Sequence, residues 1–169
     1  PQLSAWLSFT RGFRPPQATE LYRLQAQQSV ADLDTETLDS AELGLHWQKG
    51  MTRVELATFA MKKRHFIFQD SGRFNVSDGK TRHVGVELQA DLRLPAGLYG
   101  GFAGSYAKQT YAFSAATPGG EQIDSGNDID TAPRTLASAR IGFDRGPGVA
   151  EFEWVHVGSH DLDAGNLTQ

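Results

Sequence analysis

The chain has 169 residues, of which 16 are basic and 20 acidic, and its formal net charge is −4. This balance excludes the basic footprint of a nucleic-acid-binding protein, and the absence of cysteine excludes disulfides and thiolate metal sites. No apolar run approaches the ~18 consecutive residues that a membrane helix needs. A mean hydropathy of −0.41 still allows a membrane β-barrel, because barrel strands alternate apolar and polar residues.

Neither end of the chain is typical of a complete protein. The chain begins with Pro1 rather than methionine, shows no signal peptide and ends on the sequence GNLTQ. We therefore interpret residues 1–169 as one partial domain of a longer protein.

Seven segments have the alternation or the composition of β-strands. They are residues 3–11, 40–48, 53–68, 82–94, 98–113, 135–144 and 149–158. The connections alternate between long (12–39, 69–81 and 114–134) and tight (48–51, 95–97 and 145–148). Every tight turn then lies at one end of an antiparallel sheet, as in an up-and-down transmembrane β-barrel. The predicted fold class is all-β, with about seven strands of such a barrel.

Residues 82–94 show the clearest alternation. One face is mostly polar and is predicted to face a watery lumen. The other face is apolar and is predicted to face lipid: Val84, Val86, Leu88, Ala90, Leu92 and Leu94. The ten steps from Val84 to Leu94 span about 26 Å at a tilt of about 40°, close to the ~25 Å apolar band of outer-membrane barrels.

Aromatic and basic residues fall at opposite ends of the apolar faces. Trp47, Phe143 and Phe152 lie beside tight turns and are predicted to form an aromatic girdle, although they would suit the core of a soluble sandwich. Lys62 lies about 20 Å above the tight-turn end of its strand. There Lys62 and Arg64 would either meet lipid phosphates or belong to a solvated strand end.

Two segments carry a family resemblance. In "SFTRGFRPPQATELYRLQ" (8–25) and "DTETLDSAELGLHWQKG" (34–50) the chain resembles the C-terminal half of TonB-dependent outer-membrane receptors. The first family motif is matched by Phe13, Arg14, Pro16, Glu20, Leu21 and Tyr22. The second is matched by Glu36, Glu42, Leu43 and Gly44. Residues 74–92 and 126–143 resemble the following hairpins of the same receptors.

The resemblance implies a fragment of a barrel of about 22 strands with an N-terminal plug. Such receptors import scarce nutrients through the outer membrane with energy from the TonB complex, and a ferric siderophore is the ligand that we favour over cobalamin, haem or sugar. The implied partners are outer-membrane lipid and lipopolysaccharide, the protein's own plug domain, the TonB complex and the small-molecule ligand. The plug and the TonB-contacting segment are not in this chain, and no resident cofactor is expected.

Ligand contacts are expected at the long-loop rim. Cations and aromatic rings suit anionic or aromatic siderophores, and the first two long loops offer both types. The candidates are Arg14, Tyr22, Arg23, Phe68 and Arg73. The alternative is that Leu21 and Tyr22 pack a short helix, 17–25, onto the barrel.

Other site chemistries have weaker support. Asp32, Asp34, Glu36 and Asp39 could suggest Ca²⁺, but the stretch lacks the glycine and spacing of an EF-hand loop, so we predict no metal site. Haem receptors of the resembled family carry a histidine in the loop between two sequence motifs, and residues 14–45 contain none, so the resemblance disfavours haem. No catalytic set appears. The carboxylates Glu42, Glu87 and Asp91 are instead expected to pair across strands with Arg53, Arg93 and Arg140.

Two other classes stay open at this point. One is a non-transport outer-membrane barrel, such as an adhesin or a porin-like protein. The other is a soluble β-protein with ligand-binding loops. An upstream plug domain would separate the receptor from the first, and dependence on detergent would separate both barrels from the second.

Overall fold

The computed structural model describes residues 2–22, 33–69, 75–117, 120 and 122–168, and it consists mainly of one antiparallel sheet. The seven strands are β1 (Gln2–Arg14), β2 (Glu36–Lys49), β3 (Thr52–Gln69), β4 (Asn75–Arg93), β5 (Leu98–Tyr111), β8 (Thr135–Arg145) and β9 (Gly148–Val157). They pair in the order β1-β2-β3-β4-β5-β8-β9, so that each strand lies beside its neighbour along the chain. The predicted seven-strand meander is confirmed.

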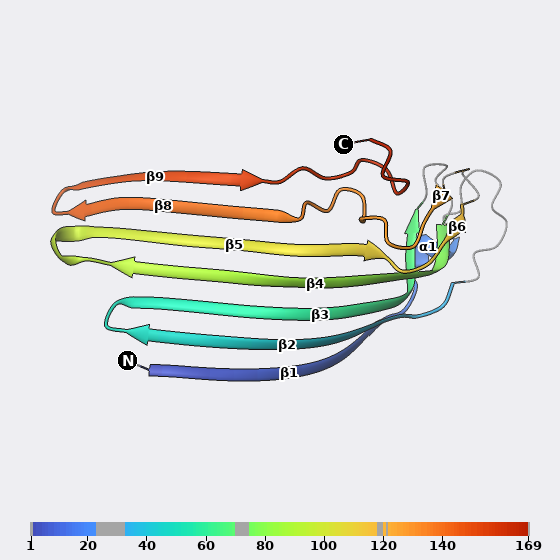
Figure 1. Ribbon diagram of the computed structural model, residues 1–169, viewed down its shortest axis with the longest axis horizontal. Coiled ribbons are helices and arrows are strands. Elements are labelled where there is room, and N and C mark those ends of the chain that lie inside the picture. The colour runs from blue at the N-terminus through green and yellow to red at the C-terminus, as the bar shows by residue number, and fades with distance from the viewer. Residues whose placement is uncertain (1, 23–32, 70–74, 118–119, 121, 169) are drawn as a thin grey trace.

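The two ends of the sheet differ as the connection lengths predicted (Figure 1). At one end, tight turns contain Gly50 and Gly146, both with positive φ, and the short 3₁₀ helix η1 (Pro95–Gly97). At the other end lie α1 (Ala18–Tyr22) and a small hairpin of β6 (Ala115–Ala116) and β7 (Gln122–Ile123). No helix in the described ranges is long and apolar enough to cross a membrane.

Strands extend further into the long-loop end than alternation indicated. β2 begins at Glu36 rather than at residue 40, and β4 begins at Asn75 rather than at residue 82. The sequence 75–81 is polar on both faces and shows no apolar period, but pairing with β3 keeps it extended. The register of this hairpin shifts between Arg64 and Phe66 and again between Phe66 and Phe68.

The alternation of residues 82–94 is reproduced across the sheet. Leu88 on β4 lies opposite Leu56 on β3 and Gly104 on β5, so that the apolar sets of adjacent strands share one face. Val84 is 49% exposed and Leu88 is 38% exposed on this face. We call it the apolar face, and the opposite one the polar face.

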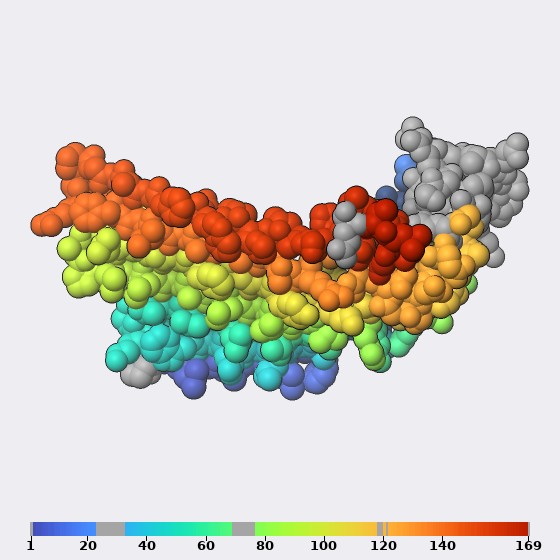
Figure 2. All heavy atoms as spheres, turned by 45° about the horizontal axis from the view of Figure 1, so that its top comes forward, coloured from blue at the N-terminus to red at the C-terminus, as the bar shows by residue number. Residues whose placement is uncertain are grey.

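Little of the molecule is core, because the sheet is a single layer (Figure 2). Among the described residues the buried apolar side chains are Ile67, Tyr111, Ile123 and Ala164. Three of them form one cluster at the long-loop end, where Figure 2 shows residues 112–117 and 122–130 gathered. A single-layer sheet with an exposed apolar face requires either lipid or another part of a protein against that face.

Candidate ligand-binding rim and inner wall

The polar face is the inner side of a curved sheet. A hollow of about 590 Å³ lies against it and is lined by side chains from all seven strands, from Trp6 on β1 to Val155 on β9. Polar-face residues such as Glu55, Glu87 and Ser138 contribute to its wall. Only a sheet that bends toward this face can bring both edge strands to one hollow, so this face is the inner wall.

Two polar contacts cross the inner wall over glycines. Arg140 on β8 donates from Nη2 to Asp91 Oδ1 on β4 at 3.0 Å, although β5 lies between these two strands. The residue of β5 between them is Gly101, where a Cβ would meet Arg140 Nε at 2.6 Å. In the same way Tyr99 reaches over Gly142 and donates from its hydroxyl to Glu151 Oε2 at 2.8 Å. The glycines therefore make room for flat side chains that link strands two apart.

Aromatic rings cover two other glycines of the inner wall. Trp6 lies over Gly44, its partner on β2, and Phe59 lies over Gly85, where a Cβ would meet the Phe59 Cζ at 2.5 Å. On the inner wall these aromatic side chains therefore lie along the sheet, over the glycines of the neighbouring strands.

Of the ion pairs predicted for this wall, one is found. Arg140 pairs with Asp91, whereas neither Arg53 nor Arg93 has a carboxylate oxygen within 4.0 Å among the residues that are described. Glu55 pairs instead with the His46 ring at 3.0 Å. The pairing of His46 with Glu55 could not be predicted from a local sequence pattern, because the two residues lie on different strands.

A charged network closes the long-loop end of β1, β2 and β3. Glu36 is 2% exposed and accepts hydrogen bonds from Arg14 Nε at 2.7 Å and from the backbone N–H of Ile67 at 2.7 Å. Lys63 Nζ lies 3.2 Å from the same carboxylate. Arg14 also donates from Nη1 to Glu20, which ties α1 to the strands. The predicted acidic loop is thus partly structural, since Glu36 is the first residue of β2.

The network fixes the charge of Glu36. Burial opposes ionisation of this carboxyl most, but the hydrogen bonds from Arg14 and from the Ile67 N–H, together with the charge of Lys63, outweigh burial. The pKa of Glu36 is therefore held below its ordinary value. The hydrogen bond to Glu36 raises the pKa of Arg14 further, so that both partners stay ionised at neutral pH.

An aromatic cluster occupies the other side of the same rim. Phe68 stacks on Phe66 with ring centroids 5.5 Å apart and lies 6.2 Å from Phe113. Phe113 in turn meets Tyr111 edge to face at 5.9 Å. Phe68 and Phe113 pack against the buried residues Tyr111, Ile123 and Ala164, which joins the β6–β7 hairpin and the C-terminal segment to the ends of β3 and β5.

The five ligand-binding candidates have different surroundings. Arg14 is engaged in ion pairs and Phe68 in the aromatic cluster, whereas Tyr22, the last residue of α1, is 82% exposed. Arg23 and Arg73 lie outside the described residues. Of the predicted helix 17–25, residues 23–25 lie outside the described residues, and α1 includes Leu21 and Tyr22. Direct ligand contact by these residues stays a prediction.

The membrane-facing candidates share the apolar face. Trp47 lies opposite Val54, Phe143 opposite Leu98 and Phe152 opposite Ile141, all near the tight-turn end. Five of the six predicted lipid-facing residues lie on this face of β4, namely Val84, Val86, Leu88, Ala90 and Leu92, and Leu94 directly follows the strand. That these side chains contact lipid stays a prediction.

Comparisons with known proteins agree with this architecture. The family model "TonB dependent receptor-like, beta-barrel" matches residues 1–168. The ferric yersiniabactin uptake receptor FyuA from Yersinia pestis is similar, with a TM-score of 0.75 and 19% identity over 98% of this chain and 25% of that one. The copper transporter OprC has a TM-score of 0.74 and 16% identity over 95% and 26% of the two chains. The siderophore receptor PiuA from Acinetobacter baumannii has a TM-score of 0.74 and 16% identity over 98% and 25%.

These identities support a shared fold, and the chain spans about a quarter of the length of each of these proteins. No curated protein sequence matches the chain. The barrels of this family are outer-membrane transport receptors rather than enzymes, in agreement with the expectation that the chain carries no catalytic set. Since the family model matches nearly the whole chain, the chain belongs to the TonB-dependent receptors and forms part of their β-barrel.

Proposed function

We propose that the chain is part of an outer-membrane active-transport receptor that binds and imports a ferric siderophore with energy supplied by TonB. The observation that carries the proposal is the match of residues 1–168 to the receptor barrel, with an apolar outer face and a polar inner wall. Two of the similar structures are receptors for siderophores or their ferric complexes. The plug and the TonB-contacting segment belong to the rest of the receptor.

The test is uptake by the full-length receptor, expressed in a strain that lacks its own siderophore receptors. We expect accumulation of ⁵⁵Fe from one class of ferric siderophore, and loss of accumulation when TonB is deleted. TonB-dependent uptake of copper but not of iron would identify a different cargo. Uptake that persists without TonB, or no uptake of any nutrient supplied, would contradict active transport and favour a porin or an adhesin.

We also propose that lipopolysaccharide contacts a belt of basic residues on the apolar face. The belt consists of Arg11, Lys62, Arg64, Lys80, Arg82 and Lys108. Lys62 and Arg82 are direct partners on β3 and β4, just above the apolar set that begins at Val84. Four of these cations line a groove of about 320 Å³. We expect this groove to lie at the headgroup level of the outer leaflet, where phosphates are the available anions.

The charge of the belt is only partly balanced within the chain. Arg11 and Arg64 both pair with Asp39, at 2.5 and 3.1 Å. Within the described ranges, Lys62, Arg82 and their neighbours Lys80 and Lys108 have no carboxylate within 4.0 Å. Unpaired guanidinium and ammonium groups at this height favour phosphate as a partner.

Binding of lipopolysaccharide to the full-length receptor in detergent tests the belt. We expect Lys62→Gln/Arg82→Gln to weaken binding, while the control Lys49→Gln, at the tight-turn end of β2, leaves it unchanged. Dephosphorylated lipopolysaccharide should bind the wild-type receptor as weakly as the double variant binds the intact lipid. Equal binding by all three proteins would exclude the belt as a lipid site.

A further inference from the structure

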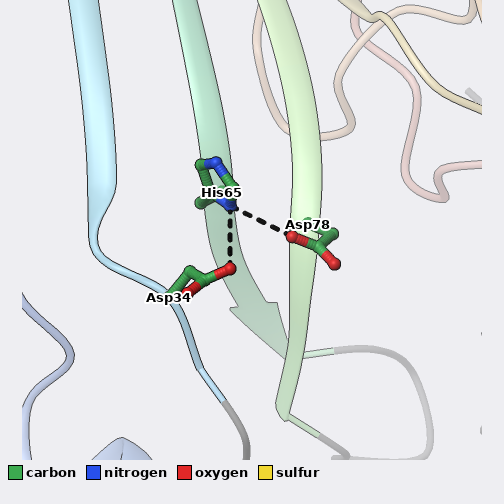
Figure 3. A group of neighbouring side chains, drawn as sticks. All are labelled: Asp34, His65 and Asp78. Atoms are coloured by element: carbon green, nitrogen blue, oxygen red, sulfur yellow. Dashed lines mark hydrogen bonds and ion pairs between the residues drawn. The ribbon is translucent and has the colours of Figure 1, made fainter.

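Three side chains, one from the segment before β2 and two from the paired strands β3 and β4, meet at the long-loop end of the sheet (Figure 3). His65 Nδ1 lies 3.0 Å from Asp78 Oδ1 and 3.2 Å from Asp34 Oδ2, and the three ligand atoms all lie within 4.8 Å of one another. Asp34 precedes β2, His65 belongs to β3 and Asp78 to β4. We propose that this trio binds a divalent transition-metal ion, with Zn²⁺ as the type ion, and thereby cross-links the first long loop to the β3–β4 hairpin.

The spacing of the atoms suits coordination. An imidazole nitrogen and carboxylate oxygens bind Zn²⁺ at about 2.0–2.2 Å, so that neighbouring ligand atoms of a tetrahedral site lie about 3.3–3.5 Å apart. The nitrogen–oxygen distances of 3.0 and 3.2 Å need only small side-chain adjustments to reach this spacing. Three protein ligands leave one position for water or another donor.

The donor set selects the class of ion. Two carboxylates and one neutral imidazole give the site a charge of −2, which a divalent ion neutralises. Ca²⁺ takes six to eight oxygen ligands and Mg²⁺ an octahedron of oxygens, so that neither suits a site with an imidazole and two oxygens. Imidazole nitrogen favours Zn²⁺ or Cu²⁺.

The backbone is irregular at two of the three positions. His65 has φ 55° and Asp78 has φ 69°, the left-handed region that side chains other than glycine rarely adopt. His65 lies at the shift of register between Arg64 and Phe66, and Asp78 lies at the next shift, between Phe66 and Phe68, so that both leave the regular ladder. The hairpin therefore departs from ideal geometry at the two positions that bring His65 and Asp78 together.

The carboxylates have few other partners. Neither Asp34 nor Asp78 has a lysine or arginine nitrogen within 4.0 Å in the part of the chain that the structure describes, and both share the single nitrogen of His65. With side chains 70% and 76% exposed, they are accessible to an ion from solution. The site could not be predicted from the sequence, since Asp34 lies in an acidic stretch and His65 lies about 30 residues further along the chain, on β3.

The test is Zn²⁺ titration of the full-length receptor, stripped with chelator and followed by calorimetry. We expect wild type to bind one more Zn²⁺ than His65→Gln, and Asp34→Asn and Asp78→Asn to weaken that site at least about tenfold. The control is Asp124→Asn, an exposed carboxylate of the same rim, which should match wild type. Retention of heat-modifiable mobility on gels would show that each variant is folded.

Two further readouts separate the metal site from an ordinary ion pair. Cu²⁺ bound to the wild-type receptor should show electron paramagnetic resonance coupling to one imidazole nitrogen, and His65→Gln should lose it. Zn²⁺ should slow amide exchange around Asp34 and Asp78 together in wild type only. Equal Zn²⁺ binding by wild type and all three variants, or displacement of Zn²⁺ by equimolar Ca²⁺, would overturn the proposal. The site does not depend on the proposed transport function.

Discussion

Glu36 is the residue on which the first long loop depends. Its carboxylate forms ion pairs with Arg14 of β1 and Lys63 of β3, and it accepts a hydrogen bond from the Ile67 N–H of β3. Arg14 also forms an ion pair with Glu20 of α1. A nearly buried carboxylate with three donors is stable only while it is charged. The side chain therefore couples the position of α1 to the ends of three strands.

This coupling predicts an acid transition at the rim. The folded-state pKa of Glu36 lies below its unfolded value, so its contribution is fully present above the ordinary pKa of 4.5 and is lost as the pH falls through the lower folded-state pKa. The protection of the Ile67 amide from hydrogen exchange, relative to its intrinsic exchange rate at each pH, should therefore fall at acid pH. In the Glu36→Gln variant, the free energy of local opening at the Ile67 amide should be about 1–3 kcal/mol lower at neutral pH, so that this amide exchanges faster. The variant should also lack the acid transition. An unchanged pH profile in Glu36→Gln would assign the transition to another group.

The glycines of the inner wall give a second prediction. A Cβ at Gly142 would overlap the ring of Tyr99, whose hydroxyl holds Glu151. Gly142→Ala should therefore destabilise the full-length receptor by about 1–3 kcal/mol in urea unfolding from lipid vesicles. Gly12→Ala is the control, because no atom lies within 4 Å of a Cβ there. Equal stability of the two variants would mean that Tyr99 moves aside without cost.

At the scale of one element, β4 tests which face meets lipid. Leu88 and Gln89 are neighbours on opposite faces at mid-height of the strand. Leu88→Arg should cost about 2–4 kcal/mol in lipid vesicles, because a charge at the bilayer midplane loses its hydration, whereas Gln89→Arg should be nearly neutral. Unfolding titrations of the two variants give the comparison, and equal tolerance at both positions would contradict the assignment of faces.

The elements differ in how well the sequence predicts them. Residues 82–94 were correctly assigned because one face is apolar at every second position, and the tight turns because proline and glycine stand between such strands. The sequence predicts a loop for residues 75–81, since these residues are mostly polar and show no apolar period. The two-residue strands β6 and β7 are too short to leave any pattern.

The candidate site was predictable only in part, for a related reason. The rim residues Arg14 and Phe68 were named from their chemistry, but their partners come from other loops. Glu36 looked like one of several acidic residues, and only the pairing of β1 with β2 brings it to Arg14. Contacts between segments far apart in the chain leave no local pattern, and they decide which charged groups are free to meet a ligand.

For the whole molecule, the open edges of the sheet govern behaviour outside the complete barrel. β1 and β9 are the two edge strands, each with one unpaired row of backbone groups. The isolated 169-residue chain should therefore form mixed oligomers in detergent, whereas the full-length receptor should elute as one discrete species in size-exclusion chromatography. A monodisperse, folded monomer of the isolated chain would show that its edges are protected in some other way.

The order of the strands also has a consequence in time. In the seven-stranded sheet each strand pairs with the next strand of that sheet along the chain. Between β5 and β8 the chain also forms the small β6–β7 hairpin, which is a separate sheet. Hairpin closure over short turns has a low entropic cost and is fast, while longer connections close more slowly. We therefore expect β2–β3, β4–β5 and β8–β9 to form first as three separate hairpins. The joining of these hairpins, through the β3–β4 loop and the connection that carries β6–β7, and the addition of β1 through the connection that carries α1, then set the rate at which the wall is completed.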